Sequence, residues 1–133
     1  MIPQPPWPTY GYPQFLWDEA KRITRSAIID RIRLNGDFLT YTEVLVLTSR
    51  FIDFADPHNP LLANMLGQIS NDEEAAGRGL LTAYVVRRDL NRPGNGYFEL
   101  AAIHGRDAFD QTRCWTEEIR GLQKHWQNST ARP

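Results

Sequence analysis

The side chains that could carry acid–base or metal chemistry are few and widely spaced. The three histidines are His58, His104 and His125, and no two of them have the spacing of a metal-ligand pair. The single Cys114 excludes an internal disulfide and any multi-cysteine metal site. No serine lies in a nucleophile motif. We therefore expect no catalytic residue, no bound metal and no cofactor.

A run of three acids, Asp72, Glu73 and Glu74, is the densest group of ionisable residues. Adjacent carboxylates can act as a general acid and base, but at the end of a helix they are more typical of a solvated acidic patch. The helix dipole disfavours negative charge at that end, and charge in an unfavourable place can mark a binding surface. Together with Arg78, which follows the helix, these acids are predicted to bind a protein partner.

Basic residues gather further along the chain. Residues 37–74 contain seven acids and one arginine, a net charge of −6, whereas residues 78–106 contain five arginines and two acids, a net charge of +3. Three of these arginines, Arg87, Arg88 and Arg92, flank a predicted loop and could contact nucleic-acid phosphates. This is the alternative to a protein partner.

Three amphipathic helices must position these groups. Apolar residues at three- and four-residue steps predict helices over 15–35 and 109–126, and in the second helix they place Trp115, Ile119, Leu122 and Trp126 on one buried face. A third helix is predicted from Pro60 to Ala76, capped by Asn59 and stopped by Gly77. A short strand at 37–41 precedes a helix from Glu43 to Ile52, for which Thr42 is the expected N-cap.

The segment after Gly77 is the most informative about fold. An apolar strand is predicted over 80–87, followed by a loop with Pro93-Gly94-Asn95-Gly96 and a segment over 97–103 that is either the returning strand or a helix. Helix, glycine stop, strand and glycine loop follow the order of a winged helix. We expect an α+β fold with a winged-helix-like core, a small antiparallel sheet and a C-terminal amphipathic helix.

Two resemblances follow from these residues. The order of Thr-Tyr-Thr-Glu-Val at 40–44, two helices, Leu80–Val86 and a glycine loop resembles the winged-helix part of alkyltransferase-like proteins over residues 40–100. Their Pro-Cys-His-Arg-Val-Val motif aligns with residues 81–86, where only Val85 and Val86 agree and Thr82 replaces the alkyl-accepting cysteine. Alkyl transfer is therefore not implied. The segments around 75–86 and 93–101 also resemble a group of small uncharacterised bacterial proteins.

Length and composition fit one globular domain. The chain has 133 residues and a net charge of −1, which argues against bulk electrostatic binding to nucleic acid or to an anionic membrane. No apolar run reaches membrane-spanning length and no signal-peptide pattern is present, so we expect a cytoplasmic protein without membrane contact. Residues 1–14 hold five of the nine prolines and form an arm, residues 15–127 form the domain, and residues 128–133 are predicted to fray.

The sequence therefore predicts a non-catalytic interaction protein. A protein partner is favoured, because the third helix, which would enter the DNA groove in a helix-turn-helix arrangement, has no lysine or arginine. Nucleic-acid binding through the basic loop is the alternative. The proline-rich arm packs either on its own domain or on a partner, and the sequence leaves the oligomeric state open.

Overall fold

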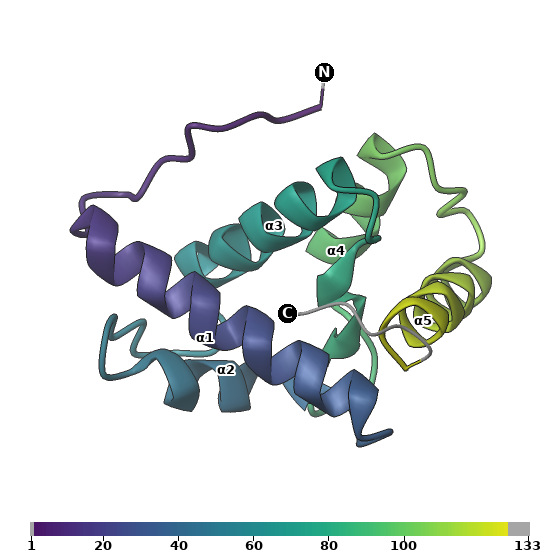
Figure 1. Ribbon diagram of the computed structural model, residues 1–133, viewed down its shortest axis with the longest axis horizontal. Helices are drawn as coiled ribbons and strands as arrows, with labels where there is room; N and C mark the ends of the chain where they lie inside the picture. The colour runs from purple at the N-terminus through teal and green to yellow at the C-terminus, as the bar shows by residue number, and fades with distance from the viewer. Residues whose placement is uncertain (1, 128–133) are drawn as a thin grey trace.

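Helices make up most of the protein, whose computed structural model describes residues 2–127 (Figure 1). Five α-helices, one 3-10 helix and two very short strands are present in this range. In chain order they are α1 (Gln14–Arg33), β1 (Leu39–Thr40), α2 (Tyr41–Thr48), α3 (Pro60–Ala75), the 3-10 helix η1 (Leu81–Tyr84), β2 (Val85–Val86), α4 (Asn95–Ile103) and α5 (Gln111–Gln127).

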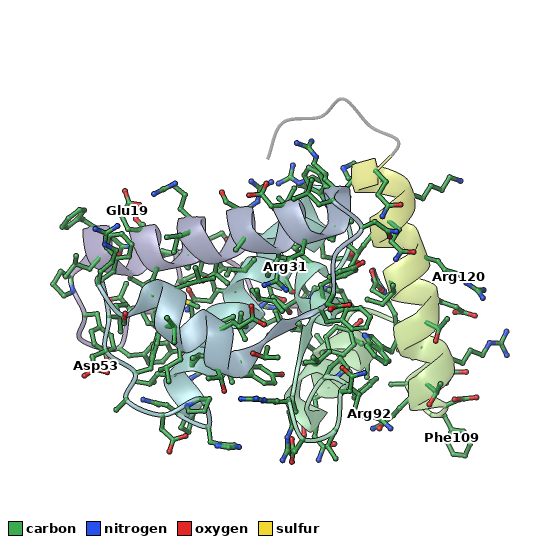
Figure 2. The ribbon with its side chains drawn as sticks, turned by 90° about the horizontal axis from the view of Figure 1, so that it is seen from below. Glu19, Arg31, Asp53, Arg92, Phe109 and Arg120 are labelled. Carbon is green, nitrogen blue, oxygen red and sulfur yellow. The ribbon has the colours of Figure 1, made fainter. Side chains whose placement is uncertain are left out.

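Helix α1 is the centre of the packing, since it contacts α2, α3, α5 and η1. Trp17, Ile28 and Ile32 of α1 are fully buried, as are Leu62 and Met65 of α3. Figure 2 shows α5 running crosswise beside the C-terminal end of α1. None of the helices between residues 2 and 127 is long and apolar enough to cross a membrane.

The N-termini of α2 and α3 are capped by polar side chains, as predicted, but the N-cap of α2 lies earlier in the chain than expected. Asn59 caps α3 by accepting a hydrogen bond from the Leu61 amide, and Pro60 is the first helical residue, as predicted. The predicted N-cap Thr42 of α2 is wrong, because Thr40 caps this helix instead. Its hydroxyl accepts from the Glu43 amide while the Glu43 carboxylate accepts from the Thr40 amide, which is a complete capping box.

The small sheet differs from the prediction. Leu39 and Thr40 of β1 pair in parallel with Val85 and Val86 of β2, so the predicted antiparallel sheet is wrong. The segment that was either a returning strand or a helix is helix α4 (Asn95–Ile103). A single antiparallel bridge between Arg87 and Arg92 closes the loop, so no strand pair forms a wing in the described part of the chain. A mostly helical small domain is observed, and a winged helix is not confirmed.

The predicted strand over 80–87 is mainly the 3-10 helix η1, because side chains satisfy its backbone in place of a neighbouring strand. Ser70 Oγ accepts from the Thr82 amide, a Glu118 carboxylate oxygen accepts from the Leu80 amide, and the Ala83 carbonyl accepts from Trp115 Nε1. All four residues of η1 are buried. A fully buried segment has the same apolar pattern in a strand and in a tight helix, so the sequence pattern could not distinguish them.

Helix α5 places its apolar residues as predicted. Ile119, Leu122 and Trp126 are buried, and Trp115 is half-buried with its indole N–H bound to η1. The opposite face is exposed, and Figure 2 shows Phe109 and Arg120 pointing away from the domain. The predicted frayed segment 128–133 lies outside the described residues.

Candidate functional site

The three acids that the sequence predicted for partner binding all make contacts within the chain, and Glu73 is the buried one. Glu73 is 2% exposed and accepts two hydrogen bonds from Arg25 of α1, at 3.1 and 3.3 Å, and two from Arg78, at 3.0 and 2.7 Å. Burial acts to raise the pKa of Glu73, but the hydrogen bonds from Arg78 and Arg25 hold it below its ordinary value. Arg78 therefore serves as an internal counter-ion in this structure.

Glu74 and Glu118 share a second arginine. Arg106 donates to both carboxylates, and Glu118 also accepts from the backbone amide of Leu80. The hydrogen bonds from Arg106 hold the pKa of Glu74 below its ordinary value. This cluster joins the end of α3 to α5 and to the loop between α4 and α5.

Asp72 fixes the N-terminal arm (residues 2–13). Its carboxylate accepts from Trp7 Nε1 at 2.8 Å and lies 3.5 Å from the ammonium group of Lys21, which in turn lies over the Trp7 ring. Gln68 of α3 donates to the carbonyl oxygen of Pro8 at 2.9 Å. Of the two alternatives left open by the sequence, the arm packs on its own domain.

Two of the three arginines that could contact nucleic acid make side-chain contacts, each with a different residue. Arg87 is paired with Asp89, and Arg92 donates to Gln111 of α5 and lies over the Phe98 ring. Arg88 is exposed. Two of the three guanidinium groups are thus already engaged, and Arg87 and Arg92 lie opposite each other at the bridge that closes the loop.

The arm, α3 and α4 instead enclose a groove of about 610 Å³. We call it the α3 groove. Its lining residues come from the arm (residues 3–10), which we call one wall, from α4 and the end of the 87–94 loop, which we call the other wall, and from α3, which we call the floor. Its lining is largely apolar and aromatic, including Trp7, Tyr10, Tyr41 and Tyr97. Only Arg87, Glu99 and His58 contribute ionisable groups other than tyrosine among the lining residues.

The floor of the α3 groove contains a glycine with empty space above it. Gly67 lies in the middle of α3, and a Cβ atom built there would meet no atom within 4 Å. A glycine inside a helix costs roughly 0.5–1 kcal/mol relative to alanine. No packing among residues 2–127 requires a glycine at position 67. Because Gly67 has no side chain, another molecule can approach the α3 backbone closely at this position.

The side-chain amide groups of Asn64 and Asn71 line the same groove as Gly67. Asn64 is exposed, while Asn71 is 7% exposed and uses its Oδ1 to contact His104 Nε2 at 2.6 Å. Both line the groove, one turn before and about one turn after Gln68, and neither Nδ2 atom has an acceptor among residues 2–127. Tyr41 accepts from the Gly94 amide at 3.3 Å and keeps its own O–H to donate. The groove therefore offers donors without described partners.

The thiol and the possible metal ligands were the chemically reactive candidates of the sequence. Cys114 is buried beside a hollow of about 360 Å³ whose lining includes Asp107, Glu117 and Glu118. Burial raises the pKa of the Cys114 thiol, so the reactive thiolate is disfavoured. Within residues 2–127 no group of three histidine, cysteine or acidic side chains could hold a metal ion.

Comparisons with protein-family models, with curated protein sequences and with solved structures found no match for this chain. The α3 groove could not be predicted from the sequence, because its lining comes from segments that are far apart in the chain. One signal was present, namely a glycine in the middle of an otherwise regular helix.

Proposed function

We propose that this protein is a non-catalytic interaction protein that binds a partner protein in the α3 groove. The observation that carries this proposal is the apolar and aromatic groove with a glycine floor that no residue between 2 and 127 fills. Grooves lined by aromatic rings are one of the surfaces in which proteins bind a peptide segment of a partner. The acids that sequence analysis assigned to the partner have a supporting role, since Asp72 holds the arm that forms one wall.

The ionisable groups near the groove favour binding over catalysis. An efficient general acid or base has a pKa near the working pH. Burial raises the pKa of Tyr41 and of Tyr97, which moves both hydroxyls further from ionisation at neutral pH. The arginine partners lower the pKa of Glu73 and Glu74, which keeps these carboxylates charged. These shifts suit groups that stay in one protonation state.

Nucleic-acid binding by a winged helix is the alternative with less support. It would need free cationic groups, and Arg87 and Arg92 are held by Asp89 and Gln111. We expect no duplex affinity tighter than about 10⁻⁶ M at physiological salt. Tight, salt-sensitive binding that is weakened by replacing Arg87, Arg88 and Arg92 with alanine would favour the alternative and contradict the proposal.

Two matched glycine variants test the groove as the partner site. Gly67→Leu places a side chain on the groove floor, and Gly121→Leu makes the same change on α5, where a Cβ atom also meets nothing within 4 Å. Both changes replace a helical glycine by a strong helix former, so both variants should fold. We expect the wild type and Gly121→Leu to retain a partner protein from a lysate of the source organism, and Gly67→Leu to lose it.

The captured protein is then identified by mass spectrometry, and its affinity is measured with purified components. A partner whose affinity falls at least tenfold on Gly67→Leu and stays unchanged on Gly121→Leu supports the proposal. A partner that binds both variants equally would contradict the groove as the binding surface.

A further inference from the structure

We infer that the α3 groove recognises an extended, proline-rich segment of the partner through the carbonyl groups of that segment. This inference rests on the proposed function and adds the chemistry of the ligand. Polyproline II segments have a solvated backbone with no internal hydrogen bonds, and they dock in grooves lined by aromatic rings. Three observations favour this ligand over a helix or an acidic peptide.

The first observation is that α3 already binds a proline-rich segment of its own chain. The N-terminal arm contains Pro3, Pro5, Pro6 and Pro8, and the side-chain amide of Gln68 donates to the carbonyl oxygen of Pro8 at 2.9 Å. Trp7 of the same arm is fixed by Asp72 at the end of α3. Helix α3 therefore holds a proline-rich segment through an amide donor, beside the α3 groove.

The second observation is that this donor belongs to a row. Asn64, Gln68 and Asn71 lie at four- and three-residue steps along α3, so they share one side of the helix. Gln68 is occupied by the arm, whereas the amide nitrogens of Asn64 and Asn71 have no acceptor in the described part of the chain. A segment rich in proline offers carbonyl acceptors and few N–H groups, which matches this set of donors.

The third observation concerns the shape and charge of the groove. Trp7, Tyr41 and Tyr97 supply rings on its walls, and Gly67 lets a backbone approach the floor. One arginine and one carboxylate, Arg87 and Glu99, line it, and Arg87 is already paired with Asp89. The lining has no net excess of charge, so it favours an uncharged segment over an acidic or basic peptide.

The inference is tested with synthetic peptides and purified full-length protein. An array of 12-residue peptides carries Pro-x-x-Pro frames, the same peptides with proline changed to alanine, and amphipathic helical peptides. Peptides that bind are resynthesised with a fluorescent label, and their dissociation constants are measured by fluorescence polarisation. We expect Pro-x-x-Pro peptides to bind, and their alanine versions to bind at least tenfold more weakly.

Three variants locate the bound peptide. Gly67→Leu should weaken binding at least tenfold, and Gly121→Leu should leave it unchanged. Asn64→Ala removes an exposed amide that the free protein does not use, so the fold should be unaffected. Loss of its one hydrogen bond should weaken peptide binding by about threefold to tenfold.

The outcomes separate this inference from the proposed function. Selection of proline-free helical peptides that Gly67→Leu still abolishes would overturn the proline inference and leave the groove as a protein-binding site. Pro-x-x-Pro binding that Gly67→Leu does not change would overturn the inference, because the peptide would lie elsewhere. Binding of no peptide, in a protein whose partner capture still depends on Gly67, would refute the extended ligand alone. If Gly67→Leu changes neither peptide binding nor partner capture, both this inference and the proposed function would be refuted.

Discussion

The buried carboxylate of Glu73 gives the sharpest test of how the charges stabilise this fold. The change is Glu73→Gln, which keeps the size of the side chain and removes its charge. Glu73 is 3% exposed at its side chain and accepts four hydrogen bonds from Arg25 and Arg78. The substituted amide can accept at one oxygen only and would turn its NH₂ group toward a guanidinium.

The expected loss of folding stability depends on how exposed the arginine partners of Glu73 are. Breaking a fully buried ion pair costs about 3–5 kcal/mol, because a charge is left without a partner. The side chains of Arg25 and Arg78 are 25% and 34% exposed, so water can solvate them in part. We therefore expect Glu73→Gln to lower the free energy of unfolding by about 2–3 kcal/mol. This loss is within the range for hydrogen bonds to charged groups and near the lower end of the range for buried ion pairs. With an m-value of about 2 kcal/mol/M, the urea midpoint should fall by about 1–1.5 M.

The pH dependence gives an independent check on the sign. The pKa of Glu73 is lowered in the folded protein from an ordinary value of 4.5, so its stabilising contribution is present above pH 4.5 and is lost as pH falls through the folded pKa. The difference between wild type and Glu73→Gln should therefore be full at pH 7 and shrink below about pH 4.5. Urea unfolding followed by circular dichroism at several pH values measures it.

The control is Glu99→Gln, which changes an exposed carboxylate on α4 with no described partner. Its free energy of unfolding should stay within about 0.5 kcal/mol of the wild type. Two results would refute the reasoning about Glu73. One is a change below about 0.5 kcal/mol at pH 7, and the other is a difference that grows as the pH is lowered.

The remaining predictions concern the core, the thiol and the arm. Trp126→Ala should lower the free energy of unfolding by about 3–5 kcal/mol, because Trp126 is 1% exposed. Trp115→Ala should cost less, about 2–3 kcal/mol, because that ring is half-buried and loses one hydrogen bond to η1; equal urea midpoints for the two variants would contradict this order. Cys114 should react with a disulfide reagent far more slowly in the native protein than in urea, and Cys114→Ser should leave partner capture unchanged. Asp72→Ala should release the arm, seen as faster proteolysis near Trp7, and unchanged cleavage would argue against the anchoring role of Asp72.

The long helices could be predicted because their patterns are local. The apolar spacing of α1 and α5, and the Asn59-Pro60 start of α3, depend on residues within a few positions of one another. The sheet could not be predicted in this way. It pairs Leu39 with Val85 in parallel, and these residues are far apart in the sequence. The glycine-rich loop was interpreted as a wing because turn residues do not identify the element that follows them.

The acids at 72–74 show what a charge pattern in the sequence leaves out. Glu73 and Glu74 were interpreted as surface groups because acids at the end of a helix are typical of a solvated patch. Their partners include Arg25, 48 positions earlier, and Arg106, 32 positions later. Only the folded chain brings these guanidinium groups to the end of α3. The α3 groove was hidden for the same reason, since its walls come from the arm and from α4.

The unfavourable position of the three acids on α3 has a physical role in the groove. Negative charge in the last turn opposes the helix dipole, and α3 has no basic residue in that turn to offset it. Each acid is instead paired with a cation from another segment, so the dipole penalty is offset by contacts that fix the end of α3 in three directions. Asp72 ties it to the arm, Glu73 to α1, and Glu74 to the loop after α4. Since the arm and α4 are the walls of the α3 groove, these charges stabilise the shape of the groove without needing to contact its ligand.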